Sequence, residues 1–185
     1  MRCFIAIELN KEIKSALLNA INILKEKDGK VRWAKPLGIH LTLKFLGKIK
    51  SEFIPKIESV LKITSKKHTS FSLNIKGIGT FPLRSKKPRI IWAGIEENES
   101  LASFQEELDK NLIELGFAGE KRKFRPHLTL GRIKSHNRID KLLSEISNYQ
   151  EFEFGKKSVS KVALFESILK PSGAEYRKII EQGLS

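Results

Sequence analysis

The tetrapeptide His-Leu-Thr-Leu occupies residues 40–43, and the same four residues return at 127–130. Each copy lies in a run of alternating apolar and polar residues, which is typical of a β-strand. Because alternate residues of a strand share a face, the histidine and threonine of each copy point to one side and the leucines to the other. A single face of this kind is usually solvated. A verbatim repeat predicts instead two similar halves, each presenting an imidazole and a hydroxyl to a shared site.

The composition indicates a soluble globular protein with a basic surface. Of the 185 residues, 40% are hydrophobic and 30% are charged, so the chain can bury a substantial core. No apolar run approaches the roughly 20 residues that span a bilayer. The N-terminus reaches Glu8 too early for a signal peptide, so we expect a cytoplasmic protein without membrane contact. The formal net charge of +14 favours a polyanionic partner such as nucleic acid.

The expected elements follow a similar order in both halves. Helices are expected to begin near Asn10, Ser51, Ser100 and Asn137, and strands flank each motif. The strand beginning at Phe71 is expected to give way to an irregular segment at Gly77, Gly79 and Pro82, and residues 176–182 are compatible with a strand or a helix. No linker or low-complexity tract separates independent units. We therefore expect residues 1–185 to form one α+β domain of two closely packed lobes.

Further segments accompany the two motifs in a fixed order: residues 2–8, 33–47, 81–82, 88–94 and 124–132, with Gly173 and Tyr176 near the end. As a set they resemble the bacterial and archaeal RNA 2′,3′-cyclic phosphodiesterases, also called the 2′-5′ RNA ligase family, within the two-histidine phosphoesterase superfamily. The resemblance covers nearly the whole chain. It implies two pseudo-symmetric lobes, each an antiparallel sheet with helices on its outer side, and an active-site cleft between them. It also implies hydrolysis of RNA 2′,3′-cyclic phosphate ends to 2′-phosphomonoesters without a metal or cofactor.

The repeated side chains suit the opening of a cyclic phosphodiester. One group must deprotonate the attacking water while another protonates the departing alkoxide, and imidazoles with a pKa of about 6.5 can do both. The hydroxyls of Thr42 and Thr129 could donate hydrogen bonds to the non-bridging oxygens, where charge grows in the transition state. Arg125 lies beside His127 and disfavours its protonated form. We therefore expect His127 to be the proton acceptor and His40 the proton donor, as the resemblance also implies.

Strand parity extends the expected substrate site to cationic side chains. Arg125 lies two residues before His127, and Lys44 lies two residues after Thr42, so both are expected on the catalytic faces. Arg125 could chelate two phosphate oxygens, whereas Lys44 would supply a point charge. Arg132 has the opposite parity and would need a bend or bulge to reach the site, although the resemblance places an arginine there.

Aromatic side chains could bind a nucleobase by stacking, although aromatic residues in strands usually belong to the core. The residues considered for this role are Phe45, Phe81 and Trp92, and Phe45 is included in the expected substrate site.

Other functions were weighed against a metal-independent hydrolase. A zinc site at His40 and His127 is disfavoured, because no cysteine or carboxylate occupies a strand position that would complete it. A non-catalytic RNA-binding module could use the same basic charge and aromatic residues, but it would not need two His-x-Thr pairs.

Ligation of RNA through a 2′-5′ bond is the same chemistry as the expected hydrolysis, run in the reverse direction. The expected partner is RNA with a 2′,3′-cyclic phosphate end, and a monomer without a required protein partner is expected.

Overall fold

The structure, a computed structural model, describes residues 1–171 and 173–185. Strands alternate with helices along most of the chain, and a strand hairpin ends it. The strands are β1 (Arg2–Glu8), β2 (Lys30–Trp33), β3 (His40–Lys48), β4 (Phe71–Phe81), β5 (Ile90–Ile95), β6 (His127–Ser135), β7 (Glu153–Val159), β8 (Lys161–Lys170) and β9 (Gly173–Gly183). The helices are α1 (Lys11–Lys25), α2 (Ile54–Lys66), α3 (Glu99–Glu114) and α4 (Asp140–Ser147), with short 3-10 turns at Pro36–Gly38 and Ser51–Phe53.

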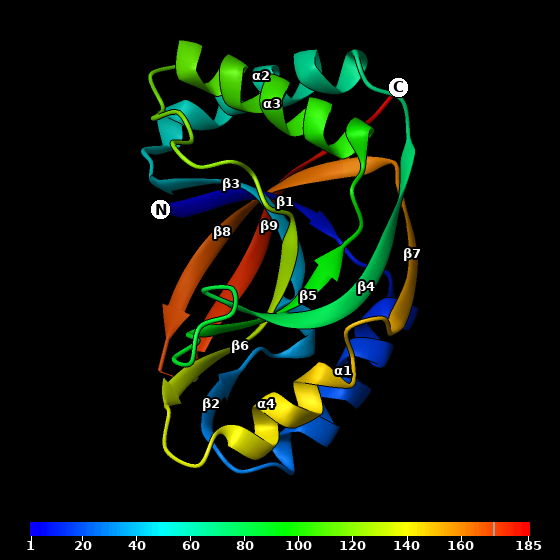
Figure 1. Cartoon of the computed structure of the whole chain (residues 1–185). Coiled ribbons are helices and arrows are strands. Elements are labelled where there is room, and N and C mark those ends of the chain that lie inside the picture. Colours follow the sequence, from blue (N-terminus) through cyan, green and yellow to red (C-terminus); the bar gives the residue numbers. More distant parts are fainter. Residues whose placement is uncertain (172) are drawn as a thin grey trace.

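Two antiparallel sheets form the centre of the molecule (Figure 1). The four-stranded sheet has the order β3-β1-β8-β9, and the five-stranded sheet has the order β2-β6-β5-β4-β7. Helices α2 and α3 pack together at one end, where they contact β9 and β3, while α1 and α4 contact β7 and β4 at the other end. The expected α+β architecture with helices outside two antiparallel sheets is confirmed. Within the described part of the chain, no helix is long and apolar enough to cross a bilayer.

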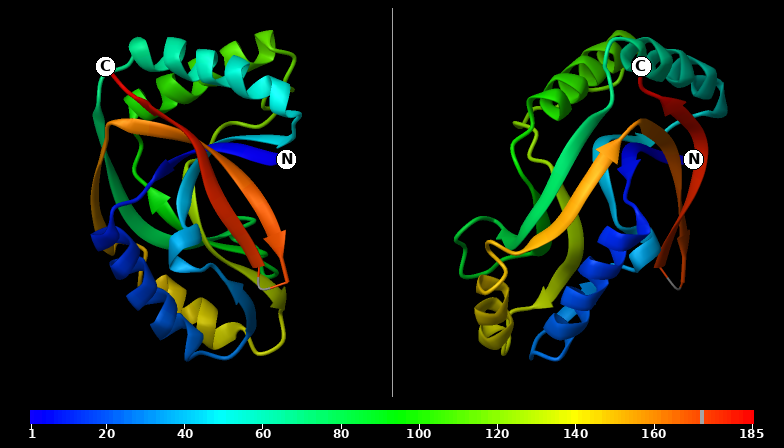
Figure 2. Two further views of the ribbon diagram at one scale, coloured as in Figure 1. Left: turned by 180° about the vertical axis from the view of Figure 1, so that it is seen from behind. Right: turned by 90° about the vertical axis from the view of Figure 1, so that its right-hand side faces the viewer.

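The hydrophobic core lies between the sheets and the helices that cover them. Each helix contributes an apolar stripe, and all four leucines of the two tetrapeptides are buried in the same cluster. The histidines and threonines of these tetrapeptides are only partly buried, so the expected division of each strand into two faces is correct. The β8–β9 hairpin runs along the side of the molecule, and the C-terminus reaches α2 (Figure 2).

Two expectations about strands need correction or completion. The strand that begins at Phe71 does not become irregular at Gly77, because β4 continues to Phe81. Gly77 has a φ of +77° at a shift in the register between β4 and β5, and a Cβ there would lie 2.6 Å from the carbonyl oxygen of Gln150. The glycine therefore permits a bulge within the strand instead of ending it. Residues 176–182 are part of strand β9.

A β-bulge follows the first tetrapeptide. Thr42 of β3 pairs with Ala6 of β1, and the next pair joins Lys44 to Ile5, so Leu43 is an extra residue without its own partner. Such an insertion reverses the alternation of side chains beyond it.

Strand β6 has the same bulge at the equivalent place. Thr129 pairs with Trp92 and Gly131 pairs with Ile91, so Leu130 is the extra residue. The burial patterns of β3 and β6 agree through the first eight residues, and in both strands the fifth residue is buried and the sixth is exposed. The two halves thus share a local irregularity as well as a tetrapeptide.

The bulge places Lys44 on the outer face of the four-stranded sheet, so the expectation that Lys44 lies on the catalytic face is wrong. Its buried ammonium donates hydrogen bonds to Oδ1 of Asp109 in α3 (2.5 Å) and to the carbonyl oxygen of Ala118 (2.8 Å). Oδ2 of Asp109 also accepts a hydrogen bond from the N–H of Glu120 (3.1 Å). Lys44 therefore holds the connection between α3 and β6 against the sheet, and it is not available to bind a substrate there.

The role of Lys44 predicts a loss of stability on substitution. Lys44→Met leaves the carboxylate of Asp109 without its charged partner, which should lower the free energy of unfolding by about 3 kcal/mol. Chemical denaturation at neutral pH measures this change. The double variant Lys44→Met/Asp109→Leu should recover more than half of the loss, because no unpaired charge remains.

Lys48→Met is the matched control, since Lys48 is an exposed residue of the same strand. Its effect should stay within about 0.5 kcal/mol. Equal effects of Lys44→Met and Lys48→Met would contradict a structural role for the buried ion pair.

Candidate functional site

The two strands that carry the tetrapeptides lie in different sheets and contact each other. His40 is the first residue of β3, and His127 is the first residue of β6. Thr42 and Thr129 follow on the same faces, opposite the buried leucines. The four residues singled out from the sequence therefore lie at equivalent positions of two adjoining strands.

Aromatic rings surround His40. The ring of Phe4 stacks on the imidazole with centroids 4.6 Å apart, and the ring of Tyr176 meets it edge-on at 5.0 Å. Phe165 lies behind Phe4 at 5.4 Å, and these two phenylalanines form a small buried cluster with Ala6 and Ala163. This apolar wall fixes the plane of the imidazole and removes much of it from water.

The surroundings of His40 disfavour its charged form. Burial is the main cause that lowers the pKa of His40 to about 4, and the ammonium of Lys14 in α1 adds to this effect. A hydrogen bond to the carbonyl of Gly38 and the carboxylate of Glu8 both act in the opposite direction. Without a bound anion, His40 is therefore neutral at pH 7.

His127 is oriented by the backbone that precedes it. Its Nδ1 lies 2.8 Å from the carbonyl oxygen of Arg125, and the ring of Phe81 meets it edge-on at 5.2 Å. A carbonyl oxygen only accepts hydrogen bonds, so this contact assigns the proton to Nδ1. Nε2 of a neutral His127 is then free to accept a proton.

An ion-pair network lies beside His40. Glu8 is the direct cross-strand partner of His40, and its carboxylate contacts the ammonium of Lys178 at 2.5 Å. Lys178 also contacts Glu181 at 2.6 Å, and Lys161 donates a hydrogen bond to Glu181 at 2.7 Å. The hydrogen bonds from Lys161 and Lys178 lower the pKa of Glu181 to about 2. The network therefore pairs the carboxylate of Glu8, beside His40, with the ammonium of Lys178.

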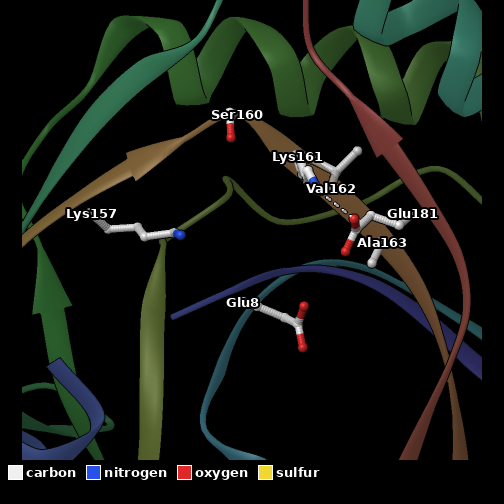
Figure 3. A pocket seen from close by; sticks show the side chains of 7 residues that line it. All are labelled: Glu8, Lys157, Ser160, Lys161, Val162, Ala163 and Glu181. Carbon is white, nitrogen blue, oxygen red and sulfur yellow. Dashed lines mark hydrogen bonds and ion pairs between the residues drawn. The ribbon is translucent and has the colours of Figure 1, made fainter. Parts of the chain in front are cut away.

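A small pocket adjoins this network (Figure 3). Two carboxylates and two ammonium groups line it, so it offers no net positive charge to an anion, and neither motif histidine belongs to it. The residues that line it are Glu8, Lys157, Ser160, Lys161, Val162, Ala163 and Glu181.

The bulges decide where the remaining expected residues lie. Phe45 pairs with Phe4, the residue that stacks on His40, so its ring is on the histidine face, where it is 72% exposed. Arg132 is exposed at the equivalent position of β6. Arg132 needed a bulge in β6 to reach the histidine face, and this bulge is present. Arg125 lies in the connection before β6 with its side chain exposed, and its carbonyl holds His127.

The other aromatic candidates form part of the wall near His127. Phe81 contacts Trp92 with centroids 5.1 Å apart, and Trp92 is the direct cross-strand partner of Thr129. The indole covers Gly79, where a Cβ would lie 2.4 Å from the ring. Of the three aromatic residues considered for stacking on a base, Phe45 is the freely exposed one.

The wall around His40 was missed by sequence analysis. Phe4, Phe165 and Tyr176 come from three strands whose pairing is not visible in the sequence. Alternation places Phe4 on one face with Glu8, but it does not reveal which neighbouring strand presents a histidine to that face.

The remaining histidines have local partners. Nε2 of His68 lies 3.3 Å from Oε2 of Glu107, and Nε2 of His136 lies 2.7 Å from the carbonyl oxygen of Pro88. Among residues 1–171 and 173–185, no three histidine, cysteine, aspartate or glutamate side chains are grouped to hold a metal ion.

Comparison with known proteins identifies relatives along the whole chain. Residues 13–167 match the family model of the 2′-5′ RNA ligase superfamily. An RNA 2′,3′-cyclic phosphodiesterase of Methanothermobacter thermautotrophicus is 34% identical over 176 residues, which are 95% of each protein. An RNA 2′,3′-cyclic phosphodiesterase of Thermotoga maritima is also 34% identical, over 98% of this chain and 94% of its own.

Solved structures agree with this relationship. The crystal structure of the Thermus thermophilus protein TT0787 matches with a TM-score of 0.84 and 28% identity, over 100% of this chain and 98% of that one. The fold is also that of Escherichia coli LigT in complex with 3′-AMP, with a TM-score of 0.78 at 22% identity over 100% and 98% of the two chains. With this fold and the family match over most of its length, the chain belongs to the 2′-5′ RNA ligase superfamily.

Proposed function

We propose that the protein hydrolyses RNA 2′,3′-cyclic phosphate ends to 2′-phosphomonoesters, with His40 and His127 as an acid–base pair. The duplicated His-x-Thr geometry on two contacting strands carries this proposal. It agrees with the activity named for relatives of similar length. Two imidazoles can supply both proton transfers, so the proposed reaction needs no metal ion.

In this mechanism, the cyclic phosphate lies between β3 and β6. Nε2 of neutral His127 accepts a proton from water as its oxygen attacks phosphorus. The bond from phosphorus to O3′ breaks on the opposite side, and the departing oxygen takes a proton from His40. The phosphate remains on O2′. Transfer of a proton from His127 back to His40, through solvent, restores both side chains for the next cycle.

The neighbouring polar groups would stabilise the transition state. The hydroxyls of Thr42 and Thr129 would donate hydrogen bonds to the non-bridging oxygens as their negative charge increases. Arg125 and Arg132 would neutralise substrate phosphates, and the exposed ring of Phe45 would stack on a base. These roles follow from their positions on or beside the histidine faces.

The predicted product separates this reaction from simple RNA binding. Incubation with an oligonucleotide that ends in a 2′,3′-cyclic phosphate, in the presence of EDTA, should yield a 2′-phosphate. His40→Ala and His127→Ala should each lower turnover by about 10²–10⁴-fold, because each removes one proton transfer.

The products are identified by mass spectrometry and nuclear magnetic resonance (NMR). Binding without any turnover by the unmodified protein would favour the RNA-binding module, and a 3′-phosphate product would refute the assignment of the leaving oxygen. Addition of an RNA with a free 5′-hydroxyl in the same assay would reveal 2′-5′ ligation.

The titration of His40 gives a separate test of the site. An acid must carry a proton, yet burial lowers the pKa of His40 to about 4 in the unliganded protein. A bound phosphate next to the ring favours the imidazolium, so the pKa should rise on binding. NMR titration should place His40 near pH 4 without ligand, and at higher pH with a nucleoside 2′-phosphate.

The pH dependence of the rate should show the same shift. The fraction of protonated His40 falls as pH rises through its pKa, so the alkaline limb of kcat should lie at higher pH than that of kcat/KM. An unliganded His40 that titrates above pH 6 would contradict the effect of the aromatic wall.

The division of labour between the histidines can be tested with a better leaving group. A lowered pKa taken alone would also suit a base, so the assignment of His40 as the acid needs a direct experiment. A cyclic substrate with sulfur in place of O3′ releases a thiolate, which hardly requires protonation. His40→Ala should recover most of its lost activity with this substrate, and His127→Ala should remain inactive. Recovery of the His127 variant instead would reverse the two roles.

A further inference from the structure

A pocket with a volume of about 260 Å³ lies at the end of β3, beside the segment that follows α3. Side chains of Phe53, Leu115 and Phe117 form its apolar part, and Lys48 and Lys50 add positive charge. The rings of Phe53 and Phe117 meet edge-on with centroids 5.7 Å apart. The residues assigned to catalysis and substrate binding do not line this pocket, so the proposed reaction leaves it without a role.

The pocket lies well away from the histidines. Glu8 of β1 pairs with His40 at the start of β3, and Arg2 pairs with Lys48 at its end. Arg2 and Glu8 are six residues apart on β1, which corresponds to about 20 Å along a strand. No side chain of the phosphate site reaches that far, so a ligand in the pocket would be a different part of the substrate.

The wall of the pocket is fixed by the contacts that join α3 to β3. Gly116 ends α3 with a φ of +90°, and the N–H of Phe117 then donates a hydrogen bond to the carbonyl oxygen of Leu112 (3.1 Å). The ammonium of Lys44 donates a hydrogen bond to the carbonyl oxygen of Ala118, the next residue (2.8 Å). The pocket is therefore preformed, so a ligand does not have to order the segment that carries Phe117.

An exposed path leads from the histidines to the pocket along β3. Phe45 pairs with Phe4, and Lys48 pairs with Arg2. The two partners lie two residues apart on β1 and share a face, so Phe45 and Lys48 share that face as well. Lys48 therefore lies on the histidine face, as does the 72% exposed Phe45. Ile49, the next residue, is buried in the core instead.

Positive charge accompanies this path. Residues 117–126 run beside β3 in the opposite direction, from the pocket to His127 (Figure 1). Residues 121–123 of this connection are Lys-Arg-Lys, and all three are exposed, as Lys48 is. Among residues 1–171 and 173–185, the ion pairs involve none of these four side chains. The path therefore carries cations that the protein does not neutralise.

This combination suits single-stranded RNA. Unpaired cations neutralise backbone phosphates, and aromatic rings bind bases of any sequence, because every base has a π-face. The charges alone would also fit an acidic peptide, but the aromatic pocket favours a strand that carries bases. At the 3.4 Å rise of a stacked strand, about 20 Å corresponds to about six nucleotides, and to fewer in an extended strand.

We propose that the RNA strand on the 5′ side of the cyclic phosphate end runs along β3, places a base in the pocket against Phe53 and Phe117, and binds a nearby phosphate at Lys48. The pocket is thus a second recognition site, which favours strands of several nucleotides over cyclic mononucleotides. The identity of the terminal group rests on the proposed function, whereas the binding of the strand does not.

The first test varies the length of the substrate. For cyclic-phosphate oligonucleotides of increasing length, kcat/KM should rise when the strand first reaches the pocket, at about four to six nucleotides. Lys48→Met should lower kcat/KM for the longer strands by about three- to tenfold, because it removes one phosphate contact. The change should be much smaller for a cyclic mononucleotide, and an equal change would overturn the site. Lys62→Met, which removes an exposed charge from α2, is the control and should leave the length dependence unchanged.

A series of abasic substrates locates the bound base. When a single abasic nucleotide is moved along the strand, one internal position should weaken binding by about fivefold or more. Phe117→Leu keeps an apolar side chain but loses the aromatic face, so it should abolish the penalty at this position. Phe53→Leu should act in the same way, and thermal melting shows that each variant is folded. A penalty that is equal at every internal position, or that persists in both variants, would refute the pocket.

A binding measurement separates this inference from the proposed function. An oligonucleotide with a 3′-hydroxyl end has no cyclic phosphate to open, yet it should still bind along β3. Its affinity should fall in Lys48→Met, and the slope of log K against log salt should become shallower by about 0.7 units. An unchanged affinity and slope would refute the site even in a protein that hydrolyses cyclic phosphates. Equally strong competition by an acidic peptide would overturn the assignment of the path to RNA.

Discussion

The extra leucine that follows each His-x-Thr sequence is the constraint on which the rest of the site depends. Before the bulge, regular alternation sends the histidine and threonine to one face and buries the leucine between them. Beyond it the parity is reversed, so the next residue is buried and the following residue returns to the histidine face. In β3 these positions are Lys44 and Phe45, and in β6 they are Gly131 and Arg132. One repeated backbone thus presents an aromatic ring from one sheet and a guanidinium from the other.

The bulge also marks where reasoning from the sequence succeeds and fails. The repeat and its alternation were sufficient to predict two similar halves and the faces of the four catalytic candidates, whereas the antiparallel sheets were expected from the family resemblance. Parity failed at Lys44, because a bulged strand reads in sequence like a regular one until its pairing partner is known. The equivalent extra residue in β6 is the bulge that Arg132 needed to reach the histidine face. Counting alternate residues therefore put Lys44 on the wrong face of β3. The same count put Arg132 on the face away from the histidine, and the observed register of β6 shows that it lies on the histidine face.

Contacts between strands distant in sequence were beyond prediction for a different reason. The wall against His40 combines Phe4 and Phe165, which pair across β1 and β8, with Tyr176 from β9. Each is an ordinary aromatic residue in an apolar strand, and only the sheet order brings them to one imidazole. The cross-strand pair of Arg32 and Arg132 was hidden in the same way. Local periodicity specifies which face a side chain occupies, but not which side chains meet on that face.

The two histidines show how a duplicated scaffold can support two different chemical roles. The carbonyl of Arg125 anchors His127, and the carbonyl of Gly38, at the equivalent position two residues before His40, favours the protonated form of that imidazole. Their surroundings then diverge: His40 is enclosed by aromatic rings that hold its pKa at about 4, whereas His127 meets one ring edge and is followed by an arginine on its own face. A substrate phosphate beside His40 would raise the pKa of that imidazole strongly, because an anion attracts an imidazolium more where water is excluded. Binding of the anion would thereby supply part of the difference between acid and base, which the identical tetrapeptides do not encode.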